Sequence, residues 1–207
     1  MSEHIWAAVL LAVLLVALGL SNTLFYLGVP FYVTRKVAHI GSAIPIVLLP
    51  VAFFSIAYPL LLSGLFVLVF ASSHKYDLFP GFARKGRWSE IYFPLSVCVS
   101  IGLLWNYNPW WAIVPPLWLA LGDGVTGLVR MKVNKREVKG WYGSLACWIV
   151  CLLVGVLTLS WAGVLGASVA TLFERFSGDA EGAIIPLDDN LTMPLSGTLV
   201  LLLWQSL

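Results

Sequence analysis

The sequence predicts an all-α fold of the polytopic membrane class, with about seven transmembrane helices. Hydrophobic residues make up 60% of the 207 positions and charged residues 11%, whereas a soluble domain has roughly a quarter charged residues. The mean hydropathy is +0.92. A single domain, residues 1–207, holds five long runs without Asp, Glu, Lys or Arg: residues 4–34, 37–74, 91–122, 140–173 and 190–207.

The membrane spans are predicted from these runs, because one pass needs about 20 apolar residues at 1.5 Å rise each. The first run lacks a basic segment before it, which favours a membrane span over a cleaved signal peptide. Residues 58–59 divide the second run, and the turn-like residues 106–109 and 160–163 divide the third and the fourth. The last run predicts one short span.

The distribution of positive charge predicts the orientation of the chain. All twelve Lys and Arg residues lie in four segments that the spans place on one side, residues 30–36, 74–90, 122–140 and 174–190. Cytoplasmic loops of membrane proteins are enriched in Lys and Arg. We therefore expect the N-terminus outside and the four polar segments in the cytoplasm. Since no presequence is visible, we expect a prokaryotic cell membrane.

Asp123 is predicted to lie within a membrane-spanning helix. The third and fourth runs are too short for two full spans each unless their helices continue into the charged segments. The helix that contains Pro115 and Pro116 must then run past Asp123. An ionisable side chain at that depth is energetically costly and is usually functional. The alternative is that Asp123 caps a helix or lies among the lipid headgroups.

The first polar segment combines two cations with a histidine. In a helix, Arg35 and His39 lie four residues apart and share one face. Anchoring at the membrane edge explains Arg35 and Lys36, but it gives no reason for His39 inside an apolar run. We therefore expect a functional group here. The basic residues of the second segment, residues 84–87, are expected to contact lipid headgroups.

The third polar segment contains small residues and a lysine that suit a phosphate. Residues 122–127 match G-x-G-x-x-G, but the dinucleotide fingerprint needs a preceding strand in a soluble βαβ unit, which this sequence does not offer. Lys139 is followed by Gly143 and Ser144. Small residues let a ligand approach the backbone, and a lysine beside them suits a phosphate group.

The fourth polar segment ends in three adjacent oxygen ligands, Asp188, Asp189 and Asn190, at the start of the last run. Mg²⁺ prefers oxygen ligands of this kind. Helix capping is the competing explanation, and a single Asp would satisfy it. Together the four segments supply cations, a histidine and oxygen ligands at one membrane face. Phosphoryl transfer at a lipid boundary needs these groups, because it depends on positioning and on neutralising charge.

Four stretches in this order resemble the integral-membrane CTP-dependent lipid kinases. This family includes phytol kinase, dolichol kinase and CTP-dependent diacylglycerol kinase, and it is distantly related to phosphatidate cytidylyltransferase. The stretches are RKVAHIGS at 35–42, GRWSEIYFPL at 86–95, GDGVTGLV at 122–129 with KGWYGSLA at 139–146, and LDDNLTMP at 187–194. Glu174 resembles an acid that often precedes the last stretch. The chain departs from the family pattern at Thr126, Arg130, Gly140 and Tyr142.

The resemblance implies an enzyme that uses CTP and Mg²⁺ to phosphorylate a membrane lipid alcohol, either an isoprenoid of the phytol or polyprenol type or diacylglycerol. It assigns three roles to residues of this chain. The implied catalytic residues are Asp123, His39 and Lys139. The implied phosphate-binding residues are Arg35, Lys36, Lys139, Gly143 and Ser144. The implied Mg²⁺ ligands are Asp123, Asp188, Asp189 and Asn190.

Two other functions stay open at this point. A cytidylyltransferase would use the same groups to join CMP to a lipid phosphate. A small transporter predicts ionisable groups distributed through the depth of the bundle, whereas here they gather at one face. The expected partners are CTP, a lipid alcohol and the lipid bilayer, and a homodimer is also open. A net charge of +2, with basic residues separated by apolar spans, argues against nucleic acid.

Overall fold

A computed structural model describes residues 2–76, 78–83, 88–134, 139–178 and 183–206. Within these ranges the chain is helical, apart from turns and an isolated bridge between Ser177 and Ile185. The predicted all-α class is therefore confirmed. The elements are α1 (Glu3–Tyr26), α2 (Phe31–Ala52), α3 (Ala57–Tyr76), α4 (Ser89–Leu104), α5 (Pro109–Leu117), the π-helical turn η1 (Trp118–Asp123), α6 (Gly124–Asn134), α7 (Trp141–Phe176) and α8 (Asp189–Gln205).

Helices α5 and α6 form one continuous helix through η1, as predicted for the helix that runs past Asp123. Its start is fixed by Asn108, whose side chain accepts a hydrogen bond from the backbone N–H of Trp110 at 2.9 Å, and by Pro109 at the first helical position, where no N–H is needed. Pro115 lies inside the helix just before η1. A π-helical turn of this kind is rare and frequently occurs at functional sites.

Helix α7 is a hairpin of two arms, with its turn at Ser160 (φ 54°, ψ −130°). The arms pack closely, since a Cβ on Gly163 would lie 2.1 Å from the carbonyl oxygen of Gly155. Trp148 on the first arm donates a hydrogen bond to Ser168 on the second at 3.0 Å. The turn predicted at residues 160–163 is thus confirmed, and the second arm returns toward the start of α7.

The two remaining predicted turns are found as well. Residues 105–108 connect α4 to α5, in agreement with the turn predicted at 106–109. The break predicted at residues 58–59 lies earlier, between Ala52 and Ala57. Pro59 occupies the first turn of α3, where its missing N–H costs no hydrogen bond. A proline in a sequence is typical of a helix end and also of a helix start, so Pro59 indicates a nearby break without showing on which side of it the break lies.

Four helical stretches in the described part of the chain are long and apolar enough to cross a membrane: Glu3–Tyr26, Phe31–Ala52, Pro109–Val133 and Trp141–Phe176. The last of these contains both arms of α7. Shorter apolar helices occur at Ala57–Ser73 and Ser89–Leu104. The predicted count of about seven spans is not confirmed. With the arms of α7 counted separately and α5–η1–α6 counted as one, the described residues form eight helical segments. This is one more than the predicted count, and it is the number that the five runs give when the second, third and fourth are each divided once.

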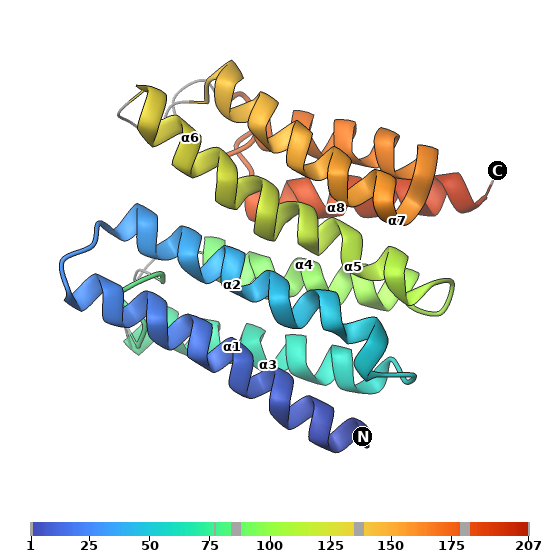
Figure 1. Ribbon diagram of the computed structural model, residues 1–207, viewed down its shortest axis with the longest axis horizontal. Helices are drawn as coiled ribbons and strands as arrows, with labels where there is room; N and C mark the ends of the chain where they lie inside the picture. Colours follow the sequence, from blue (N-terminus) through green and yellow to red (C-terminus); the bar gives the residue numbers. More distant parts are fainter. Residues whose placement is uncertain (1, 77, 84–87, 135–138, 179–182, 207) are drawn as a thin grey trace.

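The helices lie side by side and bring the polar segments to one end of the bundle. Figure 1 shows the α1–α2 connection and the C-terminal end of α6 at one end, and both chain termini at the other. The core between α5, α7 and α8 is centred on Trp118, which is fully buried and donates its indole N–H to the carbonyl of Cys151 at 2.9 Å. Gly166 and Gly197 leave room for its ring.

Candidate functional site

The Asp123 carboxylate lies at the end of η1 and faces α2. It is 4% exposed. Its Oδ2 atom accepts a hydrogen bond from Lys36 Nζ at 2.6 Å and lies 3.2 Å from His39 Nδ1. Asp123 therefore does not cap a helix, because the helix continues on both sides of it. Lys36 and His39, two predicted site residues from the first polar segment, therefore lie beside the Asp123 carboxylate.

The glycines near Asp123 allow α2 to approach this helix closely. A Cβ on Gly127 would lie 2.2 Å from Lys36 Cε, and a Cβ on Gly124 would lie 2.7 Å from Ile40 Cγ1. On the opposite side, Gly122 packs against the sulfur of Cys151. In this chain the G-x-G-x-x-G pattern thus serves helix packing, and Gly127 gives the Lys36 side chain a path to Asp123.

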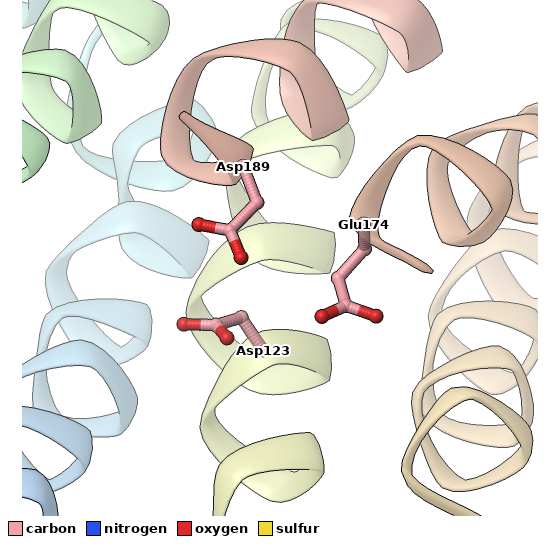
Figure 2. Close-up of side chains that lie close together, drawn as sticks. All are labelled: Asp123, Glu174 and Asp189. Atoms are coloured by element: carbon pink, nitrogen blue, oxygen red, sulfur yellow. The ribbon is translucent and has the colours of Figure 1, made fainter. Parts of the chain in front are cut away.

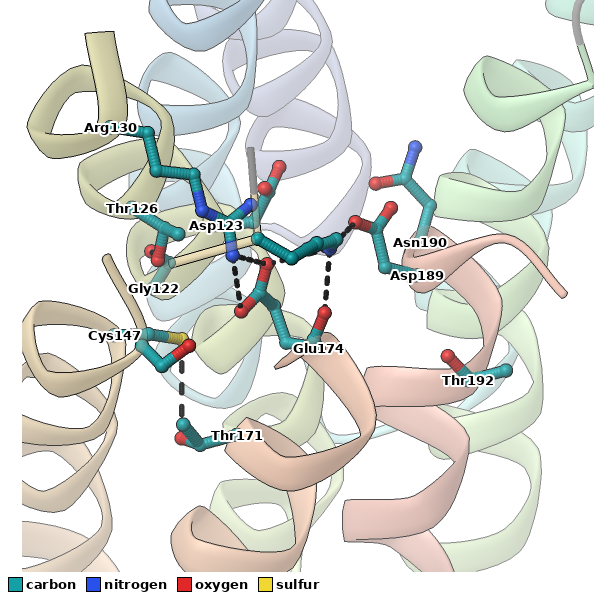
Figure 3. Close-up of polar contacts among 12 residues, drawn as sticks. Gly122, Asp123, Thr126, Arg130, Cys147, Thr171, Glu174, Asp189, Asn190 and Thr192 are labelled. Carbon is teal, nitrogen blue, oxygen red and sulfur yellow. Dashed lines mark hydrogen bonds and ion pairs between the residues drawn. The ribbon is translucent and has the colours of Figure 1, made fainter. Parts of the chain in front are cut away.

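Glu174, at the end of the second arm of α7, is the centre of a second charged group. It is fully buried. Arg130 Nη2 donates to its two carboxylate oxygens at 2.9 and 3.1 Å, and Lys139 Nζ donates to Oε1 at 2.9 Å and to the Glu174 carbonyl at 2.6 Å. Lys139 also pairs with Asp189 Oδ2 at 2.7 Å. Figure 3 shows Arg130 and Asp189 on either side of Glu174.

The two groups meet, because carboxylate oxygens of Asp123, Glu174 and Asp189 lie within 4.8 Å of one another. Figure 2 shows the three carboxylates converging from η1, α7 and α8. Carboxylates this close repel one another unless cations compensate them. Burial lowers the pKa of Lys139, but the charges of Asp189 and Glu174 raise it more, so the pKa lies above its ordinary value and the ammonium stays charged.

The start of α8 divides its three oxygen ligands between different tasks. Asp188 is the N-cap, since its Oδ1 accepts from the backbone N–H of Asn190 at 2.9 Å, and its Oδ2 accepts from the Ser89 hydroxyl. Burial, and then the neighbouring charge of Asp189, raise the pKa of Asp188 above its usual range. Asp189 instead faces Lys139. The capping alternative therefore holds for Asp188, whose metal role stays a prediction.

Asn190 is fully buried, and only one of its two polar side-chain atoms has a hydrogen-bond partner among the described residues. Its Nδ2 donates to the carbonyl of Ser89 at 2.8 Å. Its Oδ1 has no hydrogen-bond partner among the described residues. A buried acceptor without a partner costs about 1–3 kcal/mol, so this oxygen is suited to a ligand that brings a cation or an N–H group.

The other predicted phosphate-binding residues lie around these groups. Arg35 Nε is 3.9 Å from Glu90 Oε1, in a pair that links α2 to α4. Gly143 lies in the first turn of α7, where a Cβ would be 2.8 Å from Arg130 Nε, so this glycine leaves space for Arg130 to reach Glu174. Ser144 is buried in the same turn. The basic residues Arg84, Lys85 and Arg87 lie outside the described residues.

Two residues of this site, Glu174 and Arg130, are not among the predicted site residues, although the resemblance points to Glu174 as an acid that precedes the last stretch. The sequence contained a signal for Glu174. Asp123 and Glu174 are each the first charged residue after a long charge-free run, and both acids end up buried at the same place. Arg130 departs from the family pattern, and nothing in the sequence around it indicates its partner 44 positions away.

No protein-family model matches the chain, and comparisons with curated proteins and with solved structures found no match.

Proposed function

We propose that this chain is a polytopic membrane enzyme that transfers the γ-phosphate of CTP to a lipid alcohol at the cytoplasmic membrane surface. The observation that supports it is the meeting of two buried carboxylates and one half-buried carboxylate with three buried cations at one end of the helix bundle. The carboxylates are Asp123, Glu174 and Asp189. The cations are Lys36, Arg130 and Lys139. Charges are rarely assembled at such a depth without a functional reason.

The donor set fits Mg²⁺, which takes oxygen ligands and usually shares them with substrate phosphates. Asp123, Glu174 and Asp189 would hold it. The next residue along the chain, Asn190, has an Oδ1 atom without a hydrogen-bond partner among the described residues and would add a neutral oxygen ligand. When bound, the ion would neutralise negative charge on the nucleotide phosphates. Lys36 and Lys139 now balance the carboxylates. On ligand binding they would become available to phosphate oxygens.

His39 is the base in this proposal. The Asp123 carboxylate beside Nδ1 favours the tautomer that has its proton on Nδ1, which leaves Nε2 to accept a proton. The ring is held by Phe93, with ring centroids 5.2 Å apart. His39 would take the proton of the lipid hydroxyl while its oxygen forms a bond to the γ-phosphorus. The bond from that phosphorus to the bridging oxygen then breaks, and CDP leaves.

Radiolabelled CTP tests the proposal directly. With purified protein, Mg²⁺ and a panel of lipid alcohols, we expect label from the γ position to appear in the extracted lipid and label from the α position to stay in the aqueous phase. Transfer of α label to a lipid phosphate would instead identify a cytidylyltransferase. If neither label reaches lipid, with any acceptor, the phosphotransferase assignment is wrong.

Lys139→Ala should raise the Michaelis constant for CTP by roughly tenfold to a hundredfold, since a hydrogen bond to a charged group contributes roughly 1.5–3 kcal/mol. The same variant should be stabilised more by Mg²⁺ than the unaltered protein, because Glu174 and Asp189 lose the ammonium that pairs with them. Thermal unfolding with and without MgCl₂ measures this second effect without any turnover.

Lys132→Ala is the matched control for Lys139→Ala, because Lys132 is an exposed lysine on α6. It should leave both the Michaelis constant and the Mg²⁺ response unchanged. Equal behaviour of the two variants would show that Lys139 contacts neither nucleotide nor metal ligands.

A further inference from the structure

An apolar cavity lies among α1, α2, α3 and α4, beside the charged site. Leucines on one face of α1, including Leu10, Leu14 and Leu18, form one wall, and Phe66 and Phe70 of α3 form another. About 100 Å³ of space lies free inside the cavity, so its walls leave room for a narrow ligand only. Because these walls are almost entirely apolar, they suit a hydrocarbon chain.

The cavity ends at the proposed base. His39 and Glu90 contribute to its lining, with Phe93 next to them. His39 Nδ1 is also 3.2 Å from the Asp123 carboxylate. One side chain therefore joins the apolar cavity to the group of three carboxylates. A ligand chain in the cavity would have its polar end at His39.

Elsewhere the described lining of the cavity offers no free hydroxyl. Ser42 and Ser63 line it, but the Ser42 hydroxyl donates to the carbonyl of His39 at 2.6 Å and the Ser63 hydroxyl donates to the carbonyl of Pro59 at 2.7 Å. Each hydroxyl thus donates its hydrogen bond within its own helix. Polar recognition in the described lining is thus concentrated at the His39 end, and a ligand with polar groups along its length would leave them unpaired.

The length of the cavity matches one hydrocarbon chain in one membrane leaflet. Its lining on α2 runs from Ala38 to Leu49, which corresponds to about 16 Å at 1.5 Å per residue. This is roughly half of the ~30 Å hydrocarbon thickness of a bilayer. A chain whose head lies at the membrane surface would reach the middle of the bilayer along this path.

We propose that this cavity binds the chain of a single-chain lipid alcohol, with the hydroxyl at His39. The inference rests on the proposed function, and it narrows the acceptor to an alcohol with one linear or isoprenoid chain. Diacylglycerol does not fit, because its two ester carbonyls would lie against Ala38, Phe82 and Phe93, next to the polar end, without hydrogen-bond donors.

Photolabelling with a single-chain alcohol that bears a diazirine in its tail tests the site without CTP. In detergent or nanodiscs we expect adducts, mapped by mass spectrometry, on α1, α2, α3 and α4. An excess of unlabelled single-chain alcohol should reduce labelling at least fivefold, whereas diacylglycerol should not. Adducts on α7 and α8, or equal competition by diacylglycerol, would overturn the proposal.

A matched pair of variants tests the walls of the cavity. Leu62 lines the cavity, whereas Leu61, its neighbour on α3, is 68% exposed on the outer face. Leu62→Trp should lower photolabelling at least fivefold and raise the Michaelis constant for the alcohol without changing that for CTP. Leu61→Trp should behave like the unaltered protein. Circular dichroism checks the folding of both, and equal labelling of both would refute the inference.

The two proposals can fail separately. If the adducts map to the cavity but no γ label is transferred, the lipid site stands and the kinase function is wrong. If γ label is transferred but the adducts lie elsewhere, the function stands and the cavity is not its acceptor site. Adduct mapping uses the unaltered protein, so this outcome does not depend on whether Leu62→Trp folds.

Discussion

Asp123→Asn should abolish phosphoryl transfer and should also lower the free energy of unfolding by about 3–5 kcal/mol, the cost of breaking a buried ion pair. The activity loss follows because the carboxylate both orients His39 and belongs to the group of three carboxylates. The stability loss follows because Lys36, which pairs with Asp123 at 2.6 Å, is left buried without its counter-charge. The γ-label assay and thermal unfolding measure the two effects.

A second substitution separates these effects. In Asp123→Asn/Lys36→Met the buried cation is removed as well, so most of the lost stability should return, since replacing both partners of a buried pair is often close to neutral. Transfer should stay absent. If Asp123→Asn alone transfers phosphate at the normal rate, Asp123 has no part in the site. If the double variant recovers activity together with stability, the role of Asp123 is structural only.

The helices and their turns could be predicted because both depend on local sequence. Charge-free runs of suitable length fold as helices, and the turn at Ser160 follows from a small-residue centre in a run that is long enough for two arms. The burial of Asp123 could be inferred in the same way, since the length of the run before it forces the helix to continue. The number of full membrane spans could not be inferred in this way. Short apolar helices such as α4 occur in a membrane protein but lack the length of a full pass.

Pairing inside the site depends on packing between distant segments and therefore could not be predicted. The return of the second α7 arm places Glu174 beside Lys139, which lies 35 positions earlier in the chain. The separate tasks of Asp188 and Asp189 follow from which of them is the N-cap, a difference of one position that the sequence leaves open. The apolar cavity has no sequence signal, because four apolar helices contribute its walls.

Glu174→Gln should have the largest effect on stability after Asp123→Asn. Glu174 is fully buried and is the shared acceptor of Arg130 and Lys139. The amide keeps the size of the side chain but removes its charge. Of the two buried cations, Lys139 then keeps Asp189 as its counter-charge, and Arg130 loses the partner that it has among the described residues. We expect a loss of about 3–5 kcal/mol in the free energy of unfolding, measured by thermal or chemical unfolding in detergent.

Arg130 provides the control for this loss. In Glu174→Gln/Arg130→Met the cation whose partner among the described residues is Glu174 is removed, while Lys139 keeps Asp189 as its partner, so stability should largely return. The stabilisation by MgCl₂ that we expect of the unaltered protein should not return, because one of the three carboxylates is still missing. A double variant that regains both would show that Glu174 only neutralises Arg130, and a Glu174→Gln variant with unchanged stability would show that the buried pairs contribute nothing to folding.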